Sequence, residues 1–409
     1  MADRDLVVVG AGIVGLAVAR ELALRDASRR VLVLEREARP GVHQTGHNSG
    51  VAHAGVYYAP GSLKARLCTE GVRDLYRYCE ARGLPHERCG KVIVALGASE
   101  VPGLDALERR ARANGVPGLR RVDAAGLRAL EPHAAGIAAL HSPHTGIVDF
   151  GAVAEAYADD VRAAGGVIRC GVDVQAVTAS TCGGAPRSAA RGVIVRHAGG
   201  EERAGFAVTC AGLWADRLAR RSGAGAEPRI VPFRGAYLRL APAKRALVRG
   251  LIYPVPDPAL PFLGVHLTRH LDGDVLIGPT ALLAGARDAY ALRTVRRRDL
   301  GETLRWPGTW RMARRWWRTG LTELRHAVSP ATLVRDAARY VPALAPGDAE
   351  PAWAGVRAQA VAADGALLDD FAFSRTAGAL HVRNAPSPAA TASLAIARHV
   401  ADEVERAER

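Results

Sequence analysis

Lysine is almost absent from this sequence of 409 residues, which contains three lysines (Lys64, Lys91 and Lys244) and 52 arginines. Alanine is abundant as well, so the ratio indicates a coding bias toward arginine and alanine, which weakens any inference from charge to nucleic-acid binding. We therefore predict no nucleic-acid partner, although the formal net charge is +14. A positive charge of this size also suits an anionic small-molecule substrate or a membrane surface.

Paired cysteines and long apolar runs are lacking too. The six cysteines form no C-x-x-C pair, which argues against a zinc ribbon and against a dithiol redox site. No apolar run approaches the roughly 20 residues that a membrane-spanning helix needs. The first apolar strand begins almost at the N-terminus and leaves no room for a signal peptide, so we expect a cytoplasmic protein without an integral membrane segment.

The strongest local pattern is a strand, a glycine turn, a helix and a second strand over residues 6–35. Gly10, Gly12 and Gly15 follow a β-branched run in the spacing G-x-G-x-x-G, and Glu35 ends the second apolar run. In a βαβ dinucleotide fingerprint these glycines permit the tight turn, the approach of a pyrophosphate and close packing of helix on strand. The helix N-terminus attracts phosphate, and the acid accepts hydrogen bonds from the adenosine ribose. The pattern predicts a dinucleotide site without separating FAD from NAD.

Residues 43–58 form the most unusual stretch, because they are too rich in glycine for a buried strand and too apolar for a solvated linker. Such a segment can lay its backbone against a flat cofactor, with Thr45, Asn48 and Ser49 as hydrogen-bonding partners. Three histidines lie in this stretch, but no Asp, Glu or Cys joins them, so we expect no metal site.

The run from His43 to Arg66 and five later blocks resemble the L-2-hydroxyglutarate oxidase/dehydrogenase family, flavoproteins of the D-amino-acid-oxidase-like superfamily. The later blocks are PFRG at 232–235, LIYPVPDP at 251–258, FLGVHLTR at 262–269, AGVRAQA at 354–360 and NAPSPAAT at 384–391. The resemblance covers nearly the whole chain. It implies an α/β fold in which a Rossmann-type FAD-binding domain is interleaved with an α+β substrate domain built on a mixed antiparallel sheet.

The length also predicts two domains. We expect a discontinuous FAD-binding domain of residues 1–90, 145–220 and 350–409, and a substrate domain of residues 91–144 and 221–349, with a basic, tryptophan-containing helical segment at 287–340.

Local patterns predict further elements inside these domains. A helix is expected from Ser62 to Arg82, with Ser62 as N-cap and Gly83 as its stop. A closing helix is expected from Ala389 to Ala407, and a solvated loop from Ser180 to Arg191.

The resemblance implies FAD-dependent oxidation of L-2-hydroxyglutarate to 2-oxoglutarate by hydride transfer to flavin N5, with a quinone or oxygen as electron acceptor. This reaction needs a base for the hydroxyl proton and cations for the carboxylates. For the base we favour His53, with His266 as its rival, because imidazole titrates near neutrality. For the carboxylates we favour Arg357 and Arg234, and Tyr57 is expected to line the pocket.

Thirteen positions are expected to contact FAD. The resemblance implies that Val174 lies beside adenine. The helix N-terminus after Pro388 is expected beside the N1/O2 edge of the flavin, where negative charge builds on reduction. The full set is Gly10, Gly12, Gly15, Glu35, Thr45, Asn48, Ser49, Val174, Gly212, Pro388, Ala389, Ala390 and Thr391.

Residues 287–326 differ from the rest in composition, with eleven arginines against four acids and four of the six tryptophans. On a helix, this mixture suits a membrane interface, where tryptophan lies at headgroup depth and arginine meets anionic lipid. The protein would then be peripheral on the inner membrane face. The alternative is a helical subdomain packed on the substrate sheet with a solvated arginine face.

Two other functions stay open at this point. An amine-oxidising relative would act on an amino acid with the same cofactor. A flavin-binding or basic nucleic-acid-binding protein would catalyse neither reaction.

Overall fold

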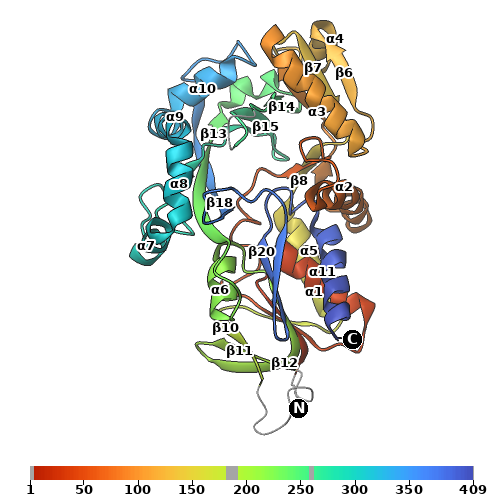
Figure 1. Ribbon diagram of the computed structural model, residues 1–409. Coiled ribbons are helices and arrows are strands. Elements are labelled where there is room, and N and C mark those ends of the chain that lie inside the picture. Colours follow the sequence, from red (N-terminus) through yellow and green to blue (C-terminus); the bar gives the residue numbers. More distant parts are fainter. Residues whose placement is uncertain (1–3, 181–191, 258–261, 409) are drawn as a thin grey trace.

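Two large sheets and one small sheet carry the fold of the computed structural model, which describes residues 4–180, 192–257 and 262–408. The two large sheets lie toward opposite ends of an elongated molecule, with helices on their flanks (Figure 1). The expected loop from Ser180 to Arg191 lies almost entirely outside the described residues.

The first sheet has eight strands and grows from the first strand of the chain. β1 pairs in parallel with β2 and with β12, and β12 pairs in parallel with β20. Valine and leucine fill most of β1 and β2, as strands buried on both faces require. The strands are β1 (Arg4–Val9), β2 (Val31–Leu34), β9 (Val167–Arg169), β10 (Val174–Ala179), β11 (Val193–His197), β12 (Gly200–Thr209), β19 (Ala372–Thr376) and β20 (Ala379–Asn384).

Successive residues of β1 enter two different cores. Leu6 and Val8 pack against a helical layer, whereas Val7 and Val9 pack on the other face with β11 and Leu218. The helical layer is made of α1 (Ile13–Arg25), α2 (Leu63–Arg82), α5 (Phe150–Ala163) and α11 (Ser393–Glu408), and the opposite face carries α6 (Ala215–Arg221).

Helix α2 confirms the helix predicted from Ser62 to Arg82. The Ser62 hydroxyl accepts a hydrogen bond from the Ala65 N–H at 3.1 Å, and Gly83 ends the helix in the left-handed conformation at φ 62°. Both ends therefore use the residue type that the sequence pattern indicates.

The second sheet has nine strands and is mostly antiparallel. Its longest pairing joins β13 to β18, and its one parallel pairing within the described ranges joins β14 to β5. The strands are β5 (Lys91–Ala95), β6 (Arg120–Asp123), β7 (Ala138–Ser142), β13 (Arg229–Leu240), β14 (Leu251–Pro254), β15 (His266–Arg269), β16 (Val275–Gly278), β17 (Leu282–Leu283) and β18 (Ala349–Val361). The two sheets together confirm the expected fold class.

Shorter elements connect and flank the sheets. Helices α7 to α10 form a column along the outer side of β13 and β18 (Figure 1). The bounds are β3 (Val51–Ala52), β4 (His86–Glu87) and β8 (Gly146–Val148) in the small sheet, then α3 (Val101–Ala113), α4 (Ala124–Leu130), α7 (Arg297–Arg305), α8 (Pro307–Arg315), α9 (Trp317–Val328), α10 (Pro330–Ala338), and the 3₁₀ helices η1 (Ala98–Glu100), η2 (Gly212–Trp214) and η3 (Pro242–Leu247).

The structure corrects three expectations. The closing helix begins at Ser393 and not at Ala389, because residues 387–392 form turns that are tied to residues 51–53 through the Thr391 hydroxyl. Strand β18 lies in the nine-stranded sheet, although residues 350–409 were expected in the FAD-binding domain. Residues 287–296 are turns and irregular backbone, so the helical part of the basic segment starts at Arg297.

Across the described ranges, every helix is too short or too polar to cross a bilayer.

Candidate active site

The three glycines of the βαβ turn line a large cavity, and each has a different reason to be glycine. Gly10 adopts φ +103°, and a Cβ there would lie 2.5 Å from the Cys210 carbonyl oxygen. A Cβ at Gly15 would lie 1.9 Å from the Gly10 oxygen. A Cβ at Gly12 would meet Thr45 Oγ1 at 3.5 Å and would otherwise enter the cavity. Gly10 and Gly15 are thus required by internal packing, whereas Gly12 keeps room for a ligand.

The N-terminus of α1 presents unpaired amides to the same cavity. Gly12 has no side chain to cap the helix, and the Thr45 hydroxyl accepts the Ile13 N–H at 3.0 Å instead. No hydrogen bond within the described residues reaches the N–H groups of Gly12 and Val14, which line the cavity. Free N–H groups at a helix N-terminus form a site for phosphate.

Glu35 is buried in the cavity wall. Its carboxylate accepts the N–H groups of Ala11 at 2.6 Å and Glu37 at 3.0 Å. These bonds fix the orientation of the carboxylate, which has further lone pairs for a ligand because a carboxylate can accept about four hydrogen bonds.

All thirteen positions predicted to contact the cofactor line this one cavity. Two of them also form hydrogen bonds with other parts of the protein. The Asn48 amide donates to the carbonyl oxygens of Gln44 and Thr45 and accepts the Gly50 N–H at 2.8 Å, so it shapes its own loop. The Thr391 hydroxyl accepts the N–H of His53 at 3.1 Å and so joins the cavity wall to the first candidate base.

His53 follows β3 and lines the cavity with a neutral ring. Its Nδ1 is buried and has no hydrogen-bond partner in the described part of the chain, and its Nε2 lies 3.5 Å from the Ser387 hydroxyl. Burial, followed by the nearby charge of Lys91, holds the pKa of His53 well below its usual range. The ring is therefore able to accept a proton at neutral pH.

His266 lies at the start of β15 and is not part of the cavity wall. Its Nδ1 lies 2.9 Å from the Gly264 carbonyl oxygen, which must accept from an Nδ1–H, and its ring stacks on Tyr253 at 4.1 Å. Burial lowers the pKa of His266 to about 4. This ring is also neutral, but it is packed and oriented more firmly than His53.

The two candidate arginines point to opposite faces of the sheet. On the β13–β18 ladder Arg357 pairs with Phe233, while Arg234 pairs with Val356, and neighbouring residues on a strand alternate faces. Arg357 lies over the Phe262 ring at 5.0 Å, and no hydrogen bond or ion pair joins it to a described residue. Arg234 donates from Nε to the Tyr290 carbonyl oxygen at 2.9 Å. The two side chains therefore do not form one carboxylate clamp.

Arg357 is exposed to solvent, although many protein atoms lie around its side chain. Burial lowers its pKa. An unpaired guanidinium in such a position is suited to an anionic ligand.

Sequence reasoning missed two buried lysines at this place. Lys91, the first residue of β5, is 1% exposed, and its Nζ lies 4.4 Å from the centre of the Tyr57 ring. Lys64 on α2 is 6% exposed, and its Nζ contacts Asp369 at 2.7 Å. Their rarity was the available signal, because a chain that uses arginine almost everywhere keeps lysine at only three positions.

These side chains act on one another. The charges of Lys91, Lys64 and Arg357 lower the pKa of His53, and protonation of His266 would lower it further. We call these five side chains the cation pocket. Tyr57 belongs to its wall, and its buried hydroxyl has no partner among the described residues.

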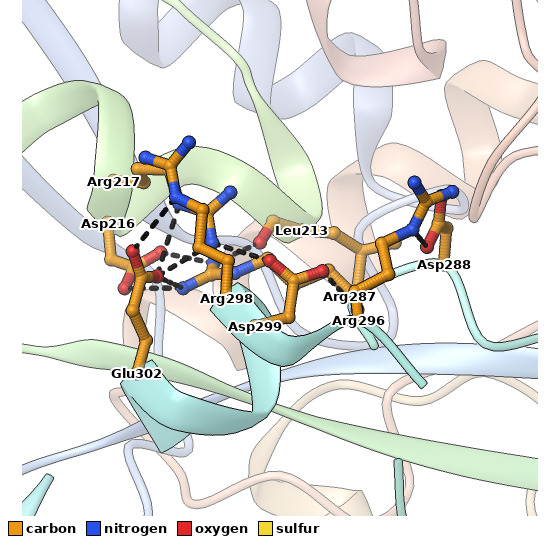
Figure 2. Close-up of polar contacts among 9 residues, drawn as sticks. All are labelled: Leu213, Asp216, Arg217, Arg287, Asp288, Arg296, Arg298, Asp299 and Glu302. Atoms are coloured by element: carbon orange, nitrogen blue, oxygen red, sulfur yellow. Dashed lines mark hydrogen bonds and ion pairs between the residues drawn. The ribbon is translucent and has the colours of Figure 1, made fainter. Parts of the chain in front are cut away.

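A buried ion network closes the cavity on another side. Figure 2 shows Arg287 directed at Asp216 of α6, and Arg217 directed at Asp299 and Glu302 of α7. Arg217 lies 2.6 Å from Asp299 and 2.7 Å from Glu302. Arg287 is 2% exposed, so part of the charge in the basic segment is neutralised inside the protein. Arg217 and Arg298 also line the cavity.

Comparison with known proteins assigns the family. A family model described as FAD dependent oxidoreductase matches residues 5–403. The mitochondrial L-2-hydroxyglutarate dehydrogenase of Nematostella vectensis is 46% identical over 408 residues, which cover 97% of this chain and 90% of that protein. The L-2-hydroxyglutarate dehydrogenase of Indibacter alkaliphilus is 41% identical over 395 residues, which cover 96% of this chain and 97% of that protein. The chain belongs to the L-2-hydroxyglutarate dehydrogenase family of FAD-dependent oxidoreductases.

Solved structures agree with the fold of this family. L-α-glycerophosphate oxidase from Mycoplasma pneumoniae, solved with FAD bound, has a TM-score of 0.78 at 22% identity and covers 99% of this chain and 95% of that chain. Glycine oxidase from Geobacillus kaustophilus has a TM-score of 0.70 at 21% identity with the same coverage. These likenesses confirm the expected FAD-binding fold.

FAD, the cofactor of the family, fits the residues present. The open space above Gly12 and the free amides of Gly12 and Val14 suit a pyrophosphate, and Glu35 is held where its remaining lone pairs face the cavity. For metals, the described residues contain no group of three or more His, Cys, Asp or Glu side chains placed to hold an ion.

Proposed function

We propose that this chain oxidises L-2-hydroxyglutarate to 2-oxoglutarate. The observation that carries the proposal is the cation pocket, in which a neutral imidazole at the cavity wall lies among cations, two of which lack a partner in the described residues. A dicarboxylate would supply the missing negative charge. The names of the relatives point to the same substrate.

The residues divide the chemistry as follows. FAD, when bound, supplies the acceptor for the hydride from C2 of the substrate. His53 takes the proton of the 2-hydroxyl group, because its ring is neutral and lines the cavity. Arg357 holds a carboxylate and orients C2, and the Tyr57 ring packs against Lys91 beside them. The products are 2-oxoglutarate, the protonated His53 and the reduced cofactor.

Anaerobic bleaching tests the proposal. Purified yellow protein is mixed without oxygen with L-2-hydroxyglutarate, its D-enantiomer, L-glutamate and glycine, and flavin absorbance is followed. We expect only L-2-hydroxyglutarate to bleach the flavin fully. Reduction by an amino acid would identify an amine oxidase instead, and no bleaching by any acid would indicate a flavin-binding protein without this activity.

A second part of the proposal concerns the electron acceptor and its location. Four apolar side chains on α9 are exposed between 47% and 73%, with the spacing of one helical face: Trp317, Leu321, Leu324 and Val328. Exposed arginines flank them on α8 and α9. We infer that this face lies on an anionic membrane surface and that a quinone accepts the electrons there. The cytoplasmic location stays a prediction.

The tryptophans of the basic segment divide between surface and core. Trp310 and Trp317 are 60% and 57% exposed, whereas Trp306 donates to the Val361 carbonyl oxygen and Trp316 packs on Met312. Only the exposed pair can therefore enter a lipid headgroup layer without unpacking the segment.

Liposome sedimentation tests the membrane contact. We expect wild type to sediment with anionic liposomes at low salt and to be released at high salt, since each arginine near an anionic leaflet contributes about 1 kcal/mol that salt screens. The triple variant W317A/L321A/L324A should stay in the supernatant, and the equally exposed control I137A should behave as wild type. This part of the proposal is contradicted if wild type does not sediment at low salt. It is also contradicted if oxygen reoxidises the flavin faster than quinone analogues do.

A further inference from the structure

Lys91 is a buried cation without a described counter-ion. No hydrogen bond or ion pair joins its Nζ to a described residue. The ammonium group lies over two aromatic faces, 4.4 Å from the Tyr57 ring centre and 4.9 Å from the Tyr253 ring centre. Burial of an unpaired ammonium is costly, and two tyrosine faces offset only part of that cost. Such a side chain is suited to an anion that arrives from outside.

The other two lysines show what a satisfied lysine looks like in this chain. Lys64 contacts Asp369 at 2.7 Å, and Lys244 contacts Asp348 at 3.1 Å on the surface. Lys91 alone of the three has no carboxylate within ion-pair distance in the described part of the chain. It is also the most deeply buried of the three.

Contacts tie Lys91 to the reaction site. Tyr57, on which its Nζ lies, is in the same loop as His53. Tyr253, the other ring, stacks on His266 at 4.1 Å. The charge of Lys91 also lowers the pKa values of both histidines.

Two unpaired cations thus accompany a substrate with two carboxylates. A guanidinium fork binds a carboxylate in a fixed plane, which suits the carboxylate beside the reacting C2 atom. An ammonium group is a point charge that attracts without fixing a plane, which suits the far end of a flexible chain. Arg357 and Lys91 match these two tasks.

We propose that Lys91 binds the C5 carboxylate of the substrate and thereby sets the preference for 2-hydroxy acids with a second carboxylate. This assignment rests on the proposed function. It makes Lys91 a specificity residue in addition to its electrostatic effect on His53.

A binding titration tests the assignment without turnover. FAD-loaded protein is titrated at pH 6.5 with 2-oxoglutarate and with 2-oxobutyrate, which lacks the second carboxylate, and the perturbation of the flavin spectrum is followed. Lys91→Met keeps the length and apolar stem of the side chain and removes the charge. We expect it to weaken 2-oxoglutarate about 10- to 100-fold, the range for a lost charge-assisted hydrogen bond, and to leave 2-oxobutyrate unchanged.

Lys244→Met is the matched control, because it removes a lysine from the surface. It should bind both ligands as wild type does. The assignment is overturned if Lys91→Met weakens the binding of both ligands equally, or if it weakens the binding of neither. If wild type itself binds no 2-oxoglutarate and is not bleached by L-2-hydroxyglutarate, the proposed function fails; if wild type prefers 2-oxoglutarate and Lys91→Met keeps that preference, only the role of Lys91 fails.

The pH dependence of wild type supplies a test that needs no variant. Burial lowers the pKa of Lys91 to about 7, and the titratable groups that face it are the Cys68 thiol, the Tyr57 and Tyr253 hydroxyls, and the rings of His53 and His266. A carboxylate binds the protonated amine, so the affinity for 2-oxoglutarate should fall up to about tenfold per pH unit above 7. The affinity for 2-oxobutyrate should fall less, and identical slopes for both ligands contradict the assignment.

Discussion

The dinucleotide cavity and the cation pocket are formed by different kinds of chemical groups. Near the glycine turn, backbone amides and missing side chains form the site, and the βαβ unit from Gly10 to Glu35 supplies this end of the cavity. In the cation pocket, side chains from α2, β5, β15, β18 and the loop after β3 come together. The glycine-turn end of the first site depends on local geometry, and the second site depends on how distant strands and helices are placed. A change in one should therefore leave the other assembled.

The largest effect is expected at Gly12. Gly12→Val should give folded but colourless protein, because the new side chain fills the space for the pyrophosphate while meeting only Thr45 at the protein side. Flavin absorbance per protein and circular dichroism measure the two properties. Gly97→Val, at a position with nothing within 4 Å, is the control and should stay yellow. Normal flavin content in Gly12→Val would place the pyrophosphate elsewhere.

The next effect is expected at His53. His53→Ala should slow flavin reduction by L-2-hydroxyglutarate about 100-fold or more, the range for loss of a general base, while flavin stays bound. Anaerobic stopped-flow absorbance gives the rate. His266→Ala is the companion variant, and a larger loss there than in His53→Ala would exchange the two roles.

A smaller effect is expected at Arg357. Arg357→Ala should weaken substrate binding by about 1.5 to 3 kcal/mol, the range for a hydrogen bond to a charged group. The substrate dependence of flavin reduction measures this change. Arg234→Ala should affect binding less, because Arg234 lies on the other face of the β13–β18 ladder and already donates to Tyr290. Equal losses in the two variants would show that both arginines reach the substrate.

The smallest effect is expected at His326, which belongs to neither site. Its ring on α9 lies 2.8 Å from Asp336 on α10, and the hydrogen bond to Asp336, together with the Glu323 carboxylate 3.9 Å away, raises its pKa to about 9. The folded state therefore holds this proton more tightly than the unfolded state, whose pKa is near 6.5. The stabilisation is complete below pH 6.5 and is lost as the pH rises through about 9.

His326→Gln should therefore destabilise the protein at pH 6 but not at pH 10. We expect a loss of about 1 to 2 kcal/mol, less than the full pKa shift implies, because Asp336 is partly exposed and solvent screens the pair. Thermal unfolding at both pH values measures this difference. Flavin content and bleaching should not change, and an equal loss at both pH values would remove the ion pair as the cause.

The comparison of the two sites also explains which of their features could be predicted from the sequence. The glycine spacing predicts the cavity because Gly10 and Gly15 are required by contacts within a short stretch. The long sequence blocks that resemble the family predict His53 and Arg357 as site residues. The opposite faces of Arg357 and Arg234 depend on the register of β13 with β18, more than a hundred residues apart, which no local pattern fixes.

Two further differences between the prediction and the structure have a local cause that the sequence pattern does not reveal. The run from Pro388 to Thr391 has the composition of a first helical turn, but its side chain at Thr391 bonds to residues 51–53 and the helix starts later. Lys91 heads an ordinary apolar strand, so periodicity marks it only as a strand end. Its burial between two tyrosines depends on the parallel pairing of β5 with β14.

The order of strands has a consequence for synthesis on the ribosome. β1 emerges first, yet its neighbour β12 follows about half a chain later, and β20 and the turn at 387–391 come near the end. α11, which covers α1, comes last of all. A nascent chain that stops before residue 379 has the glycine turn but lacks one wall of the cavity and the cover of its first helix. FAD is therefore enclosed only after nearly the whole polypeptide has been made, and interrupted chains present an apolar helix in place of a loaded enzyme.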